Sequence, residues 1–359
     1  MKSILGSSVF ALAAAACPTS KNATATGCPA VSGDMTISSY QLYPENADYD
    51  PKRCLVYFSA VYNSTVAAWN PQTNKVEKTL TVPGLSDDPS LHLSGVKVDP
   101  QGCLSLVVDA GSAFDTSGAD ISGDNFLVKY DLASDKVLWQ ANLTALTDGA
   151  YGGYQDVTHD ARDGASFVVG TFPSSLIKVT ADGDAKSWYL KTPANHTIKG
   201  FSGLVPSPDG NSLLVSDSFD GKLYRFDMAA EQGTPQNVPI TTRNGTATQM
   251  TTSLDGVSIP PRWGGKVILV SDNAAGTHVL YSADASWTSA VLRGTVPNRL
   301  AGAGGFTVAT VSVGSGSGSG SSVYAVTEWF TDAKVPGSRA GDRAQFPLVD
   351  ITADIWALL

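Results

Sequence analysis

The chain has 359 residues, of which 42% are hydrophobic and 16% are charged, and this composition excludes an intrinsically disordered protein. Its length is sufficient for a large core, and closed all-β folds of this size form one domain. The formal net charge of −9 leaves no basic surface for a phosphate backbone. We therefore expect no nucleic-acid partner.

The N-terminus has the layout of a secretory signal peptide. Lys2 precedes an apolar run that ends in small residues at Ala14, Ala15 and Ala16, and this pattern predicts cleavage of residues 1–16. The alternative is an N-terminal helix of the mature fold. No other segment has the ~18 uninterrupted apolar residues of a membrane span, so no span is expected. Residues 17–34 would be an extension and residues 35–359 a single domain.

Five Asn-x-Ser/Thr sequons support passage through the secretory pathway. They predict N-glycosylation at Asn22, Asn63, Asn142, Asn195 and Asn244. The expected location is the secretory lumen or the outside of the cell.

The four cysteines all lie in the first third of the chain. In an oxidising compartment they are expected to form two disulfides, and four cysteines allow three connectivities. The pairing we prefer is Cys17–Cys28 with Cys54–Cys103. There is no CxxC motif, so neither a zinc site nor a thioredoxin-type redox centre of that kind is expected.

A short apolar strand that ends in a small or acidic residue recurs at intervals of about 50 residues. The six copies are residues 55–59, 104–109, 166–170, 213–217, 267–272 and 323–328. Most are preceded by a Gly-containing turn, such as 99–102 or 207–210, and by another apolar strand. Several are followed by a strand with an aromatic residue and Asp, as in 127–131 and 223–227.

Strands and turns repeated six times in this way predict a six-bladed β-propeller with four-stranded blades. Residues 346–351 are expected to pair with the N-terminal strand 35–39, which closes the ring and removes open sheet edges. The Gly/Ser run 314–322 lies between two predicted strands and is interpreted as a solvated hairpin loop.

In a propeller, the innermost strand of each blade begins at one mouth of the central channel, and the loops after the second strands cover the same face. Carboxylates and aromatic side chains are therefore predicted to converge there, as in a small-molecule site. The alternative for Asp109, Asp217 and Asp272 is that they bind backbone N–H groups in turns. His92 is the one histidine that this pattern places near the mouth, whereas His159 precedes a turn and is interpreted as structural.

Three segments resemble the gluconolactonase/senescence-marker family of six-bladed propellers: 44–50, 201–210 with 216–218, and 254–257. That family binds a divalent cation through a Glu, an Asn and an Asp and hydrolyses lactones. The resemblance places the Glu at Glu45 and the Asp at Asp255, but Ser202 stands where the Asn is required. A hard cation requires several oxygen ligands, so no metal cofactor is expected; any ion would use Glu45 and Asp255.

The organisation of the whole chain is more similar to that of fungal propellers of secondary-metabolite pathways. The resemblance rests on the leader, the start 43–46, the six degenerate blades and the sequons. It extends to the trichothecene-cluster propellers and the hetero-Diels–Alderases of tropolonic sesquiterpene biosynthesis. It implies a cofactor-independent cyclase or cycloaddition catalyst that binds small hydrophobic terpenoid or polyketide intermediates.

Such chemistry requires apolar walls that hold two partners together and a hydrogen-bond donor that polarises a carbonyl. The expected donors are Tyr154, Gln155, Ser202 and Trp329. The expected substrate-binding residues are Glu45, His92, Phe172, Phe201, Asp217, Phe219, Asp255 and Phe330. Two alternatives remain open, a metal-dependent lactonase or esterase and a secreted propeller that only binds a carbohydrate or protein partner.

Overall fold

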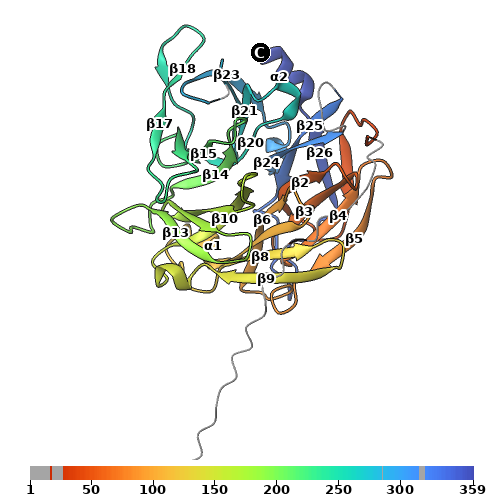
Figure 1. Ribbon diagram of the computed structural model, residues 1–359. Coiled ribbons are helices and arrows are strands. Elements are labelled where there is room, and N and C mark those ends of the chain that lie inside the picture. The colour runs from red at the N-terminus through yellow and green to blue at the C-terminus, as the bar shows by residue number, and fades with distance from the viewer. Residues whose placement is uncertain (1–16, 18–26, 285, 315–319) are drawn as a thin grey trace, which may run out of the picture.

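The computed structural model describes residue 17 and residues 27–284, 286–314 and 320–359. Six β-sheets are arranged around a central channel, and the labels of the innermost strands lie around the centre of Figure 1. The six-bladed β-propeller expected from the repeat is confirmed. The predicted signal peptide and the Asn22 sequon lie outside the described residues, as do residues 315–319 of the Gly/Ser run.

The first three blades are formed by strands that follow one another in the sequence. Blade 1 contains β2 (Pro44–Asp50), β3 (Leu55–Ala60), β4 (Thr65–Asn70) and β5 (Lys75–Thr81). Blade 2 contains β6 (Leu91–Val98), β7 (Leu104–Ala110), β8 (Phe126–Asp131) and β9 (Lys136–Asn142). Blade 3 contains β10 (Gly152–His159), β11 (Ser166–Phe172), β12 (Ser175–Val179) and β13 (Ala185–Leu190).

The second half of the chain begins with another blade of consecutive strands and then departs from this pattern in blades 5 and 6. Blade 4 contains β14 (Phe201–Pro206), β15 (Ser212–Asp217), β16 (Lys222–Asp227) and β17 (Gln236–Val238). Blade 5 contains β20 (Leu254–Ser258), β21 (Val267–Asp272), β22 (Gly276–Tyr281) and β23 (Ala290–Pro297). Its outer edge carries the hairpin of β18 (Ile240–Thr241) and β19 (Ala247–Thr248), with β18 parallel to β23.

Blade 6 joins the two ends of the chain. It contains β24 (Phe306–Gly314), β25 (Ser321–Glu328), β26 (Gln345–Asp350) and, as its outermost strand, β1 (Met35–Ser38). Met35 pairs with Leu348 and Ile37 with Phe346, so the closure predicted from the sequence is confirmed. The innermost strands β2, β6, β10, β14, β20 and β24 contact one another in a closed ring.

All six copies of the sequence repeat are the second strands of their blades, namely β3, β7, β11, β15, β21 and β25. Their apolar side chains are buried on both faces because each blade packs between two neighbours. Short turns join the inner to the second strand in blades 1 to 4. In blade 2, Asp99 accepts hydrogen bonds from the Gly102 and Cys103 N–H groups (2.6 and 2.9 Å), and Gly102 adopts φ +95°, which favours glycine.

Two disulfides attach the N-terminal extension to the blades, but the preferred pairing was wrong. Cys17 is bonded to Cys103 and Cys28 to Cys54. Cys17 and Cys28 each pair with a cysteine in a turn of a blade, so neighbours in the sequence are not neighbours in space. Among the sequons in the described residues, Asn142, Asn195 and Asn244 are exposed, whereas Asn63 is half-buried.

Helices are short and peripheral. They are α1 (Ser112–Asp115), α2 (Thr352–Leu358) and the 3₁₀ turns Ala145–Thr147, Pro261–Trp263 and Ala301–Ala303. Within the described ranges, no helix is long and apolar enough to cross a membrane. The two disulfides are consistent with a secreted or lumenal protein.

Candidate functional site at the N-terminal mouth

Each inner strand carries a register shift near its N-terminal end. The shifts lie between residues 44 and 47, 93 and 95, 154 and 156, 201 and 204, 254 and 257, and 307 and 309. A β-bulge places an extra residue in the strand and redirects a side chain. Glu45, Ser94, Gln155 and Asp255 lie within these bulges, and all four line the same cavity.

We call this opening the N-terminal mouth, because it lies where the inner strands begin. Its cavity measures about 440 Å³, a volume suited to a small organic molecule. Loops from four blades complete the wall. The lining residues are Glu45, Val61, Tyr62, His92, Ser94, Phe114, Asp115, Ser117, Gln155, Lys199, Asp255, Asn273, Phe330 and Lys334.

Glu45 is the most unusual group in the cavity. Its Oε2 atom is buried and, among the residues that the structure describes, has no hydrogen-bond partner. Burial, followed by the nearby carboxyl groups of Asp255, Glu328 and Asp109, raises the pKa of Glu45 well above its ordinary value. The protonated form of Glu45 is therefore favoured over a wider pH range than that of an ordinary glutamate.

Asp255 lines the same cavity as Glu45, but its side chain has a hydrogen-bond partner. The amide of Asn273 donates to its Oδ2 atom at 2.7 Å. Burial raises the pKa of Asp255 to about 6, while Lys199 and the bond from Asn273 act in the opposite direction. The bond from Asn273 favours the charged form of Asp255, whereas the Oε2 atom of Glu45 has no such donor in the described part of the chain.

Aromatic rings form the less polar part of the wall. The rings of Tyr62 and His92 meet edge to face with centroids 5.5 Å apart. Burial, and then the charge of Arg339, lowers the pKa of His92 to about 4, so the imidazole is neutral at physiological pH. Phe114 packs edge to face on Phe172 behind it, at 5.7 Å.

Two contacts connect the loops that surround the mouth. Arg339, in the segment 330–344 of blade 6, forms an ion pair with Asp115 beside α1. His196 contacts the Gly118 carbonyl at 2.5 Å from the other side. Gly111 allows the first contact, because a Cβ there would lie 2.7 Å from His92 Nε2 and 2.9 Å from Arg339 Nη1.

The structure brings five of the sequence-predicted site residues together in this cavity: Gln155 among the donors, and Glu45, His92, Asp255 and Phe330 among the binding residues. Gln155 donates from Nε2 to the Ser202 carbonyl at 2.6 Å, so one of its N–H groups is already used.

Three predicted donors require correction, because their side chains are directed into the blades. Tyr154 is fully buried in the core that includes Val157 and Ile177. The Ser202 hydroxyl bonds to that of Ser216 at 2.9 Å. Trp329 is 2% exposed and lies with its ring 4.2 Å from the Arg343 guanidinium. None of the three lines the cavity.

Four predicted binding residues also lie outside the cavity lining. Phe201 is a core residue that stacks on Tyr189, and Phe172 forms a second layer behind Phe114. Asp217 accepts a hydrogen bond from the Phe219 N–H at 2.8 Å, which is the turn role weighed as its alternative. Phe219 is 56% exposed beside Lys191.

Charged and polar loop residues were missed. Lys199, Asp115, Ser117 and Lys334 line the cavity from connections between strands. The strand repeat locates strand ends, but it contains no information about which inserted loop folds over the channel.

The donors at this mouth do not fit a divalent cation. Glu45 and Asp255 supply two carboxylates, but the Ser202 hydroxyl is not offered to the cavity and Asn273 occupies one Asp255 oxygen. In the described part of the chain, the one cluster of three potential metal ligands is Cys17, Asp99 and Cys103, and both of its cysteines are in a disulfide.

Fold and site together define a disulfide-linked six-bladed propeller with a small-molecule cavity at one mouth of its channel. The sequence matches the model of the Mal s 1 allergenic protein-like family over residues 23–304, and the chain belongs to that family.

Two relatives cover nearly the whole chain and confirm its resemblance to fungal secondary-metabolism propellers. Trichothecene biosynthesis protein 14 of Trichoderma arundinaceum is 32% identical, covering 92% of each chain. Core trichothecene cluster protein 14 of Fusarium sporotrichioides is 30% identical, covering 91% of this chain and 87% of its own. The crystal structure of the Malassezia sympodialis allergen Mala s 1 superposes with a TM-score of 0.75 at 22% identity, covering 89% of this chain and 96% of the allergen.

Proposed function

We propose that this protein is a cofactor-independent cyclase of fungal secondary metabolism, of the hetero-Diels–Alder type, acting on a terpenoid or polyketide intermediate at the N-terminal mouth. The observation that carries the proposal is the buried carboxyl of Glu45, whose pKa is raised and whose Oε2 atom has no hydrogen-bond partner among the described residues, in a cavity with aromatic walls. The names of two relatives, which refer to trichothecene biosynthesis, support a biosynthetic role. The disulfides support a site of action in the secretory pathway or outside the cell.

In the proposed mechanism, the Glu45 O–H group donates a hydrogen bond to the carbonyl oxygen of the heterodiene. This withdraws electron density from the diene and stabilises the charge that develops on oxygen in the transition state. One C–C and one C–O bond form together while the π bonds rearrange. No group leaves, no redox partner is required, and the proton stays on Glu45.

The cavity walls supply the second contribution, which is orientation. Tyr62, Phe114 and Phe330 would hold the diene and the alkene face to face. Holding two reactants in a near-attack geometry lowers the barrier by several kcal/mol. Asp255 and Lys199 would bind hydroxyl or carbonyl groups elsewhere on the substrate, since both are polar members of the same wall.

The test uses the full glycosylated chain after chelator treatment. It is incubated with an α,β-unsaturated ketone as the heterodiene and humulene as the alkene, beside a control without protein. We expect faster cycloaddition and one dominant stereoisomer. Product ratios equal to those of the control would rule the proposal out.

A metal-dependent lactonase is the second candidate, favoured by the approach of Glu45 and Asp255 to one another. It would be supported if Ca²⁺ or Zn²⁺ bound stoichiometrically, raised the thermal midpoint and restored lactone hydrolysis to the chelated protein. Absence of both turnover reactions, with retained binding of small molecules, would favour a binding propeller instead.

A further inference from the structure

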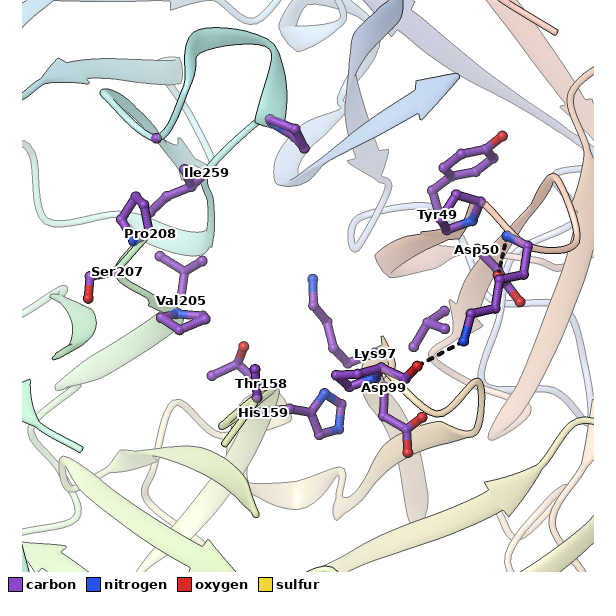
Figure 2. A pocket seen from close by; sticks show the side chains of 18 residues that line it. Tyr49, Asp50, Lys97, Asp99, Thr158, His159, Val205, Ser207, Pro208 and Ile259 are labelled. Carbon is purple, nitrogen blue, oxygen red and sulfur yellow. Dashed lines mark hydrogen bonds between the residues drawn. The ribbon is translucent and has the colours of Figure 1, made fainter. Parts of the chain in front are cut away.

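A second cavity occupies the other end of the channel, where the inner strands end. We call this opening the C-terminal mouth, and its cavity measures about 570 Å³. Figure 2 shows Tyr49 on one side of it, with Val205 and Ile259 across from it. Pro100, Pro206 and Pro261 add rigid apolar surface. The wall is thus suited to an apolar molecule of moderate size.

A buried hydrogen-bonded chain leads to this cavity from inside blade 2. The Lys129 ammonium forms an ion pair with Asp99 at 2.6 Å and donates to Ser105 Oγ at 3.2 Å. Ser105 Oγ contacts His159 Nε2 at 2.9 Å. All four residues are at most 7% exposed, so water does not compete for these bonds.

The hydrogen-bonded chain points to one tautomer of His159. The Lys129 ammonium only donates, so Ser105 Oγ accepts from it, and we assign the Ser105 hydroxyl proton to the bond with His159 Nε2. Burial, and then the charges of Lys129 and Lys97, hold the pKa of His159 well below its ordinary value, so the ring is neutral. A neutral imidazole that accepts at Nε2 carries its proton at Nδ1.

His159 Nδ1 is left as a hydrogen-bond donor without a protein acceptor among the described residues, although the ring lines the cavity. Lys97 lies beside His159 at the same edge of the opening (Figure 2) and bonds to Asp48 at 3.1 Å, which leaves further N–H groups. The acidic groups at this mouth are occupied. Asp50 binds Arg53 at 2.7 Å, and Asp99 binds Lys129.

We propose that the C-terminal mouth is a second small-molecule site, which binds an apolar molecule through one carbonyl oxygen that accepts a hydrogen bond from His159 Nδ1. An apolar wall with donors, whose two lining carboxylates are already paired, selects a ligand whose polar head accepts. Ketones, lactones and carboxylates share this chemistry. The site is independent of the reaction proposed for the N-terminal mouth.

The first test is calorimetric titration of the full chain with 2-undecanone, undecanoate and n-undecane. We expect the ketone and the carboxylate to bind one molecule per chain, and the alkane to bind at least tenfold more weakly. His159→Phe keeps an apolar ring but removes the donor, and should weaken ketone binding about five- to tenfold. Phe219→Ala, which lies outside the lining of both cavities, should leave it unchanged.

Lys97→Met distinguishes the two kinds of acceptor. A carboxylate gains from the ammonium charge, so this variant should weaken undecanoate binding more than 2-undecanone binding. Equal binding of alkane and ketone, an unchanged affinity in His159→Phe, or loss of binding in Phe219→Ala would each overturn the proposal.

A measurement on the unmodified protein tests the proposal even if the variants fail to fold. The ¹⁵N shifts of the His159 imidazole should report a proton on Nδ1 and should move when 2-undecanone is added. Ser105→Ala should shift the tautomer toward Nε2–H. A proton on Nε2 in the unmodified protein, or no response to the ketone, contradicts the assignment.

Discussion

The two mouths of the channel differ in what surrounds them and therefore in the chemistry they offer. The N-terminal mouth is covered by long inserted loops and contains two buried carboxyl groups with raised pKa values and aromatic rings. The C-terminal mouth is formed by tight turns and prolines and offers donors held by a buried chain of polar groups. Loops can vary without unfolding the ring, whereas turns between paired strands cannot, so we assign the reaction to the first mouth and fixed recognition to the second.

The largest expected effect comes from Glu45. Glu45→Ala removes the proposed donor and should lower the cycloaddition rate about 100-fold, as observed when one oxyanion donor is removed from an enzyme. Glu45→Gln retains a weaker N–H donor, so its cycloaddition rate should lie between those of the unmodified protein and Glu45→Ala. Stopped-flow or product analysis measures the rate.

Phe219→Ala is a suitable control for Glu45→Ala, because Phe219 lies outside the cavity lining. It should retain the full rate. If Glu45→Ala keeps its fold and its full cycloaddition rate, Glu45 is not the donor and the reaction is no longer assigned to the N-terminal mouth.

Phe330 tests the aromatic wall. Phe330 and Phe219 are both exposed phenylalanines, at 40% and 56%, but only Phe330 lines the cavity. Phe330→Ala should raise the substrate Kd or KM about tenfold, since burying an aromatic side chain against a ligand contributes roughly 1–2 kcal/mol. If Phe219→Ala has the same effect, the exposed ring and not the cavity is responsible.

The Arg339–Asp115 ion pair tests the loops around the N-terminal mouth. Arg339→Ala should release the segment 330–344 and speed both ligand association and amide hydrogen exchange there by a few-fold. Exchange in the turn 99–102 at the C-terminal mouth should not change. Faster exchange at both mouths would mean that the variant loosens the whole ring.

The smallest effect concerns stability against pH. Folding raises the pKa of Asp255 to about 6 and of Asp156 to about 7, and it also raises that of Glu45 well above its ordinary value. These groups bind more protons in the folded than in the unfolded chain, so the free energy of unfolding should fall as pH rises from ~4 to ~7. The thermal midpoint should be a few degrees higher at pH 5 than at pH 8.

Asp156→Asn should flatten the dependence, because it removes a titrating group while retaining side-chain contacts to Asn46. A midpoint that rises steadily from pH 5 to pH 8 would show that these carboxyls are ionised in the folded state.

The sequence predicts the ring well because a propeller repeats one local pattern. The second strands, the turns such as 99–102 and the closing pair β1–β26 all follow from short-range periodicity. It also places Glu45, Gln155 and Asp255 correctly at the mouth, since they begin inner strands. Bulges limit this accuracy: a shift of one residue directs Ser202 into the blade and leaves Tyr154 in the core.

Contacts between distant segments could not be predicted from the sequence. Nothing local indicates that Lys199 and Lys334 fold over the same cavity, or that Cys17 reaches Cys103. His159 was interpreted as structural because it precedes a turn. Its polar chain connects three strands of two blades, so only the folded ring shows that one nitrogen faces a cavity.

The most direct test of the central claim is the protonation state of Glu45 in the folded protein at neutral pH. Infrared difference spectroscopy between the unmodified chain and Glu45→Gln reports it. We expect a carboxylic-acid C=O band that disappears in the variant and shifts when a carbonyl-containing substrate analogue binds. A carboxylate band in its place would contradict the proposal that a neutral acid polarises the substrate.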